Sequence, residues 1–242
     1  MEWRDEGVLL SMRPHGESAV IIEVFTPSRG RHAGVVRGGA SRKLAPALQP
    51  GNLLDLVWQA RIQDHLGQFT AELIESRSAL WDNRLTLAGL NAVCALLHFA
   101  LPERDPHADL YHASLGLLRA MDSTPDWPRL YLGWEMLLLD VLGYGLDLSH
   151  CAVSGATEGL AYVSPKTGRA IARDAAGQWA DRLLALPPCL LGAAPQDADE
   201  LVLALSTTGH FLTARLAHDL APRPFPVARQ RLIDLLARAA RE

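Results

Sequence analysis

Cysteine and aromatic residues are scarce in this chain, and long apolar runs are missing from it. Of its 242 residues, 3 are cysteines and 6% are aromatic. The cysteines are scattered and odd in number, which favours reduced thiols over a disulfide framework. No apolar run approaches the roughly 20 residues that span a bilayer. The start of the chain also lacks the apolar run of a signal peptide. We therefore expect a cytoplasmic protein without membrane contact.

The usual enzymatic motifs are also absent. The sequence contains no GxxxxGK[ST], no GxGxxG after a predicted strand, no GxSxG and no HExxH. His107 and His112 are five residues apart, so they do not share a helical face as a pair of metal ligands would. Asp140 and Asp147 lack the further carboxylates that a metal-dependent nuclease needs. We predict no catalytic residue, no metal and no cofactor, which makes a nucleic-acid enzyme the least favoured class.

Acidic residues are missing from residues 24–54, although the chain as a whole carries a formal net charge of −4. We call residues 24–54 the basic segment. Its local excess of positive charge against the sign of the whole chain indicates a surface for a polyanion. Interspersed glycines favour turns that a phosphate backbone can approach. The alternative is a solvated loop without a specific partner. The cations of the segment are Arg29, Arg31, Arg37, Arg42 and Lys43.

The overall composition is that of a soluble globular protein, with 49% hydrophobic and 21% charged residues. A chain of this length suits one large domain or two small ones, since domains most often have about 100 to 150 residues. We predict two domains. The first covers residues 1–78 and the second covers residues 79–242.

Short segments rich in β-branched residues predict five strands in the first domain. In the clearest of them Leu54, Leu56 and Trp58 share one face, which is the alternation of a half-buried strand. Five strands in such a short stretch indicate an OB-fold barrel, a fold whose open face binds nucleic acids. Trp58 and Phe25 lie among apolar residues, so a core role is favoured over base stacking. The predicted strands are residues 8–12, 18–26, 31–36, 53–62 and 69–74.

Apolar residues recur at helical spacing after Ser76 and predict an all-α second domain. A helix is expected to begin at Asp105-Pro106, with the aspartate as its cap. Residues 147–178 are small, polar and glycine-rich, and predict a β or loop insertion. The fold class is thus α+β, a five-stranded barrel followed by an all-α domain with a small insertion. The other predicted helices are near residues 90–101, 130–142, 181–186, 197–205, 208–220 and 227–241.

The first domain contains a series of short motifs, which are RPHGES at residues 13–18, FTP at 25–27, Gly30-Arg31, and GGA at 38–40 before LQP at 48–50. These motifs resemble the RecO family of bacterial DNA repair and recombination mediators. In the second domain, residues 135–145 resemble the helix before the family's insertion. VARQRL at residues 227–232 resembles the family's last helix. The resemblance covers both domains in the right order.

This resemblance implies a function that needs no cofactor. A RecO-family protein is expected to bind single- and double-stranded DNA, to anneal complementary strands, and to act in the nucleoid. With RecR it would help RecA replace single-strand-binding protein (SSB). Phosphates would contact the cations of the basic segment. Three further cations on the last helices either extend this phosphate-binding surface or are solvated without a role, and they are Arg215, Arg229 and Arg231. The alternative function is an OB-type protein-interaction module without annealing activity.

The resemblance also implies a site for the acidic, aromatic-ended tail of SSB. Such a tail needs a cation for its carboxylates and an apolar pocket for its terminal ring. Arg129, Leu132 and Trp134 lie close together on one predicted helix and offer both. The alternative is that Leu132 and Trp134 belong to the core and that Arg129 is solvated.

One departure from the family concerns zinc. Many members hold a structural zinc with two CxxC pairs in the insertion. Here the first pair is Cys151-Ala152-Val153-Ser154, and the next cysteine is Cys189. One thiolate cannot replace a four-ligand site, so we predict that the insertion lacks zinc. Packing must then hold it together, and the candidate residues are Leu160, Tyr162, Val163 and Ile171.

Overall fold

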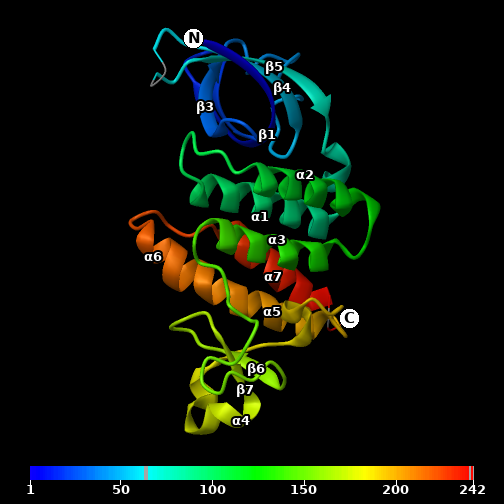
Figure 1. The fold of residues 1–242 in the computed structure, drawn as a ribbon. Coiled ribbons are helices and arrows are strands. Elements are labelled where there is room, and N and C mark those ends of the chain that lie inside the picture. The colour runs from blue at the N-terminus through cyan, green and yellow to red at the C-terminus, as the bar shows by residue number, and fades with distance from the viewer. Residues whose placement is uncertain (63–64, 240, 242) are drawn as a thin grey trace. The chain divides into compact units, whose positions relative to one another are not determined.

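The structure is a computed structural model that describes residues 1–62, 65–239 and 241. The chain forms two compact units, and Figure 1 shows their elements. The first unit contains Met1–Thr124 and Pro226–Leu232, and the second contains Pro125–Phe225 and Ile233–Glu242. The predicted domain boundary after residue 78 stays a prediction.

Five strands close into a barrel in the first unit, and every pairing between neighbouring strands except one is antiparallel. The order around the barrel is β1-β2-β3-β5-β4, and β1 pairs with both β2 and β4. Closure between β3 and β5 is parallel and rests on the pair Val35 and Gln68. This topology is OB-like, as predicted. The strands are β1 (Glu2–His15), β2 (Ala19–Thr26), β3 (Gly30–Val36), β4 (Leu53–Gln59) and β5 (Gln68–Glu75).

The barrel is filled by the inward faces of its strands. Leu54 and Leu56 are completely buried and Trp58 is 1% exposed, which confirms the predicted alternation and the core role of Trp58. The Trp58 indole donates a hydrogen bond to the Leu66 carbonyl at 3.2 Å, so its one polar group is satisfied. Phe25 is also buried. The predicted end of the fourth strand was wrong, because β4 ends at Gln59 and Ile62 is exposed.

Two long helices follow the barrel in the first unit. A 3-10 turn (Ser78–Trp81) precedes α1 (Arg84–Ala100), and α2 (Ala108–Ser123) packs beside α1 (Figure 1). The Asn83 side chain caps α1 by accepting from the Leu85 N–H at 2.8 Å. The predicted start of α2 was wrong. Asp105 precedes the helix, and its backbone packs so closely on Gly30 that a Cβ there would lie 2.2 Å from the Asp105 carbonyl oxygen.

The second unit begins with α3 (Trp127–Val141) and continues into a small three-stranded sheet. Its strands are β6 (Leu160–Val163), β7 (Ala170–Ala172) and β8 (Leu184–Ala185), in the order β7-β6-β8. A short helix α4 (Arg173–Ala176) and a 3-10 turn (Gly177–Arg182) connect β7 to β8. The helix predicted at residues 181–186 was therefore wrong, because β8 pairs with β6 there and lies beyond the predicted insertion.

The remaining segments are mainly helical. After a 3-10 turn (Pro188–Leu191), α5 (Ala198–Phe211) begins at Asp197, whose side chain accepts from the Glu200 N–H at 2.7 Å. A π-helical turn (Leu212–Leu216) leads directly into α6 (Ala217–Asp219). The two helices predicted at 197–205 and 208–220 are thus one continuous helical run. The last helix, α7 (Val227–Ala239), contributes its first part to one unit and its second part to the other.

Candidate nucleic-acid interface

The β2–β3 hairpin separates the cations of the basic segment from one another. Arg29 lies in the turn between β2 and β3, whereas Arg37 directly follows the far end of β3. Seven residues of β3 lie between these two ends. At about 3.3 Å per residue, the strand separates them by roughly 20 Å. The cations of the basic segment therefore lie at two different ends of the barrel and do not form one patch.

Arg37, Arg42 and Lys43 lie at the end of the barrel where the β1–β2 turn also lies. His15 pairs with Ala19 at that turn, and the Ala40 N–H donates to the Ser18 carbonyl at 3.1 Å. These contacts bring the end of β1, with Arg13, next to the loop after β3. Sequence reasoning did not include Arg13 among the binding residues, because only strand pairing reveals its position. We call the four residues Arg13, Arg37, Arg42 and Lys43 the loop-end cluster.

Every member of the loop-end cluster is exposed. In the part of the chain that the structure describes, none of the four makes a hydrogen bond or an ion pair through its side chain. Helical turns between Ser41 and Leu48 hold Arg42 and Lys43, with the Leu44 carbonyl accepting from the Leu48 N–H at 3.1 Å. Exposed cations without carboxylate partners leave a positive potential that a phosphate backbone can neutralise.

Arg29 occupies a different environment at the opposite end of β3. Its guanidinium lies 5.8 Å from the centre of the Trp3 ring, which is cation–π geometry. Its backbone N–H donates to the Thr26 hydroxyl at 3.0 Å and fixes the turn. The side chain is exposed, and Arg29 stays a predicted phosphate contact that lies apart from the loop-end cluster.

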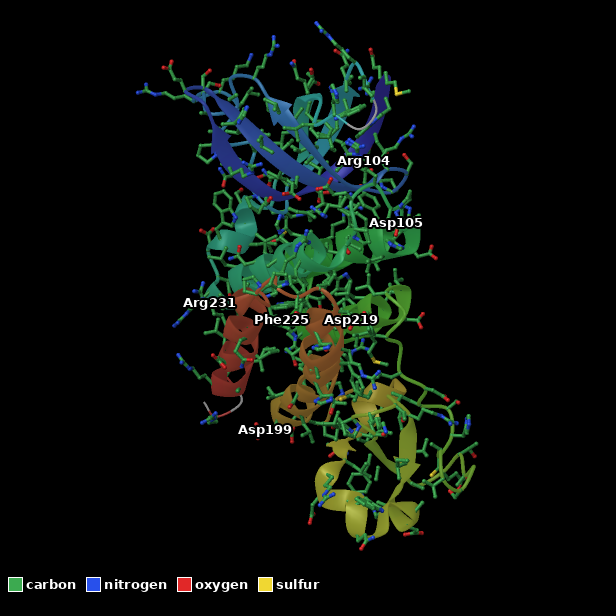
Figure 2. All side chains as sticks on the ribbon, turned by 90° about the vertical axis from the view of Figure 1, so that its left-hand side faces the viewer. Arg104, Asp105, Asp199, Asp219, Phe225 and Arg231 are labelled. Carbon is green, nitrogen blue, oxygen red and sulfur yellow. The ribbon has the colours of Figure 1, made fainter. Side chains whose placement is uncertain are left out.

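Arg31 is not available for DNA, and its prediction as a phosphate contact was wrong. The residue is 5% exposed, and its guanidinium forms an ion pair with Glu23. Its Nε donates to the Leu101 carbonyl at 2.9 Å. The backbone of Arg31 also contacts the chain after α1, because the Arg31 carbonyl accepts a hydrogen bond from the Arg104 N–H at 2.8 Å. Figure 2 shows Arg104 beside the barrel. Arg31 therefore ties the barrel to the chain that follows α1.

Burial and two hydrogen-bonding neighbours act on the pKa of Glu23 in opposite directions. Burial would raise the pKa of this carboxyl, but the bonds from His98 and Arg31 hold its pKa below the usual value. His98 Nε2 lies 3.0 Å from Glu23 Oε1. Glu23 is consequently charged at neutral pH and is the counter-ion that Arg31 needs in this buried position.

The three predicted cations of the last helices differ in accessibility. Arg231 is exposed on α7 (Figure 2), whereas Arg215 is half-buried in the π-helical turn. Arg229 is 5% exposed. Burial of Arg229 contradicts its prediction as a surface contact, because a phosphate could not reach it without displacing its neighbours. Arg231 and Arg215 stay predicted contacts.

The predicted tail-binding residues on α3 are also mostly inaccessible. Leu132 is 2% exposed and Trp134 is 3% exposed, so both side chains belong to the core. The Trp134 ring packs 5.6 Å from the ring of Tyr131, measured between centres. Arg129 is half-buried, and its Nε donates to Asp126 at 2.8 Å. The prediction that Leu132 and Trp134 form a surface pocket was wrong, because the buried face of α3 carries them.

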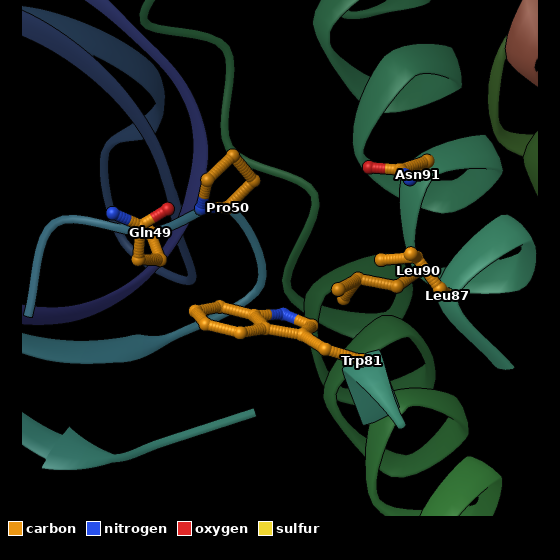
Figure 3. A pocket seen from close by; sticks show the side chains of 6 residues that line it. All are labelled: Gln49, Pro50, Trp81, Leu87, Leu90 and Asn91. Carbon is orange, nitrogen blue, oxygen red and sulfur yellow. The ribbon is translucent and has the colours of Figure 1, made fainter. Parts of the chain in front are cut away.

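Sequence reasoning missed an open apolar pocket in the first unit, which Figure 3 shows. Its volume is about 380 Å³, and Trp81 is its most prominent exposed side chain at 44%. Nothing in the sequence around Trp81 distinguishes it from a core tryptophan. The pocket is lined by Gln49, Pro50, Trp81, Leu87, Leu90 and Asn91.

Within the described residues, no three or more His, Cys, Asp or Glu side chains converge as a metal site would require. The insertion has an apolar core in which Cys151 packs with Ile171, and Leu160 and Tyr162 pack against them. Val163 is completely buried. The predicted role in packing the insertion is thus confirmed for Leu160, Tyr162 and Ile171, and that of Val163 stays a prediction. No described helix is long and apolar enough to cross a membrane.

Comparison with known proteins decides the family. The model for "Recombination protein O N terminal" matches residues 1–77, and the model for "Recombination protein O C terminal" matches residues 82–224. The chain belongs to the RecO family. The DNA repair protein RecO of Cereibacter sphaeroides is 62% identical over 239 residues, covering 99% of this chain and all of the relative. RecO proteins of Ruegeria sp. and Dinoroseobacter shibae are 59% and 54% identical, each with 99% of the relative covered and with 98% and 99% of this chain covered.

The RecO family is a family of DNA repair and recombination proteins, and this chain is one of its members. The names of these relatives state no catalytic activity. The barrel and the helices α1 to α6 lie within matched segments, and the loop-end cluster belongs to the part of the chain that matches the N-terminal model.

Proposed function

We propose that this RecO-family chain binds single- and double-stranded DNA and anneals complementary strands in the nucleoid. Together with RecR, it helps to load RecA onto single-stranded DNA that is coated with SSB. The observation that carries this proposal is the loop-end cluster. Four exposed, positively charged side chains without carboxylate partners lie at one end of an OB-like barrel, where the phosphate backbone of DNA can approach them.

The mechanism follows from charge neutralisation. Two complementary strands repel each other until cations screen their phosphates, so a protein that binds both backbones can bring the bases together. An open cationic surface suits this task because it leaves the bases accessible for pairing. Arg29, Arg215 and Arg231 are further candidates for phosphate contacts at other places on the chain. Arg129 remains the accessible cation of α3 for the acidic tail of SSB.

The salt dependence of binding tests the proposal. Four phosphate contacts to a single strand correspond to a slope of log K against log salt of about −2.8, at roughly −0.7 per contact. Replacing Arg37, Arg42 and Lys43 together by Ala should make the slope less steep by about 2. The measurement is fluorescence anisotropy of a labelled oligonucleotide over a series of salt concentrations. An unchanged slope in the triple variant would place the DNA elsewhere.

A further inference from the structure

The pocket beside Trp81 combines an aromatic face with carboxamides. In Figure 3 the Trp81 ring lies below Gln49 and Pro50, with the leucines beside its edge. Leu90 is 1% exposed and gives the pocket a fixed apolar wall, whereas Trp81 is 44% exposed. A Cβ on Gly51 would lie 2.2 Å from Leu90, so glycine lets the Gln49–Gly51 turn sit directly on α1. The pocket is therefore a built feature of the first unit.

The polar groups of the pocket are neutral and have unused hydrogen-bonding capacity. The Gln49 amide donates to the Ala45 carbonyl at 2.8 Å, which leaves its oxygen as an acceptor. Asn91 is exposed and, among the described residues, its side chain makes no hydrogen bond. No charged residue lines the pocket. An indole face with amide donors and acceptors suits a planar heterocycle that stacks and hydrogen-bonds, and does not suit a phosphate.

The loop that forms one side of the pocket also carries two cations of the loop-end cluster. Gln49 and Pro50 follow the helical turns that hold Arg42 and Lys43. Gln49 is six positions after Lys43, so even a fully extended chain would place their backbones at most about 22 Å apart, and the turns between them shorten that span. Phosphates held by Arg42 and Lys43 and a base held in the pocket can therefore belong to the same short stretch of strand. This charge complementarity selects DNA over an uncharged aromatic ligand as the occupant.

We infer that the Trp81 pocket binds an unpaired base of the single-stranded DNA whose phosphates contact the loop-end cluster. This inference rests on the proposed function and adds the way in which the base is held. A base inside a duplex is already stacked and paired, so the pocket favours single strands over double strands. Every base has an aromatic face, and the pocket therefore holds the strand without selecting a particular sequence.

Substitution of Trp81 in the full-length protein tests the inference. Stacking of one base typically accounts for a five- to 150-fold difference in affinity, and we expect Trp81→Ala to weaken binding of an oligothymidylate by about tenfold. Trp81→Phe should keep most of the affinity because it keeps a ring. Trp81→Leu keeps an apolar side chain without the ring and should lose as much as Trp81→Ala. Trp179→Ala is the matched control, because Trp179 is an exposed tryptophan in the 3-10 turn Gly177–Arg182 of the second unit.

An oligonucleotide with abasic positions separates stacking from phosphate contact. The native protein should bind it about tenfold more weakly than the intact strand, and Trp81→Ala should cause no further loss. The salt slope should be the same for the native protein and for Trp81→Ala, since the indole carries no charge. The inference would be overturned if Trp81→Ala lost as much affinity for the abasic strand as for the intact strand. It would also be overturned if a folded Trp81→Leu protein bound the intact strand as tightly as the native protein. If the inference failed but the triple substitution of Arg37, Arg42 and Lys43 still made the salt slope less steep by about 2, the proposed function would stand without the pocket.

Discussion

The N–H of Ala40 donates a hydrogen bond to the carbonyl of Ser18 at 3.1 Å. This one bond joins the β1–β2 turn to the loop after β3, although the two positions are 22 residues apart in the chain. Arg13 is thereby added to the cations Arg37, Arg42 and Lys43, which come from a separate part of the sequence. The cationic end of the barrel is thus a product of strand pairing.

The contribution of Arg13 can be tested by single substitution. Arg13→Ala should make the slope of log K against log salt less steep by about 0.7 for single-stranded DNA, because one phosphate contact is lost. Arg4→Ala is the matched control on the same strand, since the Arg4 guanidinium is already paired with Asp55. Fluorescence anisotropy at several salt concentrations gives both slopes. Equal slopes for native protein and Arg13→Ala would remove Arg13 from the interface.

Arg31 should matter for stability and not for DNA binding. Removal of one partner from a buried ion pair typically destabilises a protein by about 3 to 5 kcal/mol, and Arg31→Ala leaves Glu23 without its guanidinium partner. We expect a loss of this size in the free energy of unfolding, measured with urea. Arg37→Ala, at an exposed position, should change it by less than about 0.5 kcal/mol. A stable Arg31→Ala protein with reduced salt slope would contradict the structural role.

His32 is buried among aromatic rings within the barrel. Its ring lies edge-on to Trp58 with 4.9 Å between the centres, and neither ring nitrogen has a hydrogen-bond partner among the described residues. Burial lowers the pKa of His32 to about 4, and the charges of Arg104 and Arg29 act in the same direction. The side chain is consequently neutral in the folded protein at physiological pH.

The stability of the first unit should therefore fall as the pH is lowered from about 6.5 to about 4. In this range the unfolded chain binds a proton at His32 and the folded chain does not, so protonation favours unfolding. A pKa difference of this size corresponds to at most about 3 kcal/mol. Urea unfolding at pH 7 and pH 4.5 measures the change, and His32→Phe should show a smaller one. The same pH dependence in both proteins would assign the effect to other groups.

Cys151 should be a thiolate at neutral pH. Burial by itself would raise the pKa of this thiol, but N–H groups that point at Sγ, from Ala172 at 3.2 Å and Ser154 at 3.4 Å, lower it to about 6. Burial raises the pKa of Cys94 to about 12 and that of Cys189 to about 11. Absorbance at the thiolate wavelength should therefore rise by one equivalent between pH 5 and pH 7. Cys151→Ser should lack this step, and its persistence there would refute the assignment.

Local patterns were sufficient to predict the barrel but not the accessibility of its charges. Alternation in β4 revealed the inward face of Leu54, Leu56 and Trp58, because that signal lies within one strand. The burial of Arg31 depends on Leu101, which is 70 residues away, and no local pattern contains that contact. Trp81 lies in a 3-10 turn too short to show a period, so its exposure could not be foreseen.

The helical predictions failed for related reasons. Arg129 was expected to lie beside accessible apolar residues of α3, but periodicity alone does not tell which apolar residues face the core. Leu132 and Trp134 are buried, whereas Leu130 is 39% exposed. The break predicted between residues 205 and 208 is also missing, because the Thr208 hydroxyl is buried and hydrogen-bonded to Glu135 at 2.6 Å rather than capping a new helix.

Annealing of complementary DNA strands that have been coated with SSB tests the central proposal most directly. The native protein should accelerate duplex formation, measured by the approach of a fluorophore and a quencher on the two strands. The Arg37, Arg42 and Lys43 triple variant should remain folded, since these residues are exposed, and should accelerate it far less at the same concentration. Equal acceleration by the native protein and the triple variant, or none by the native protein, would contradict the account.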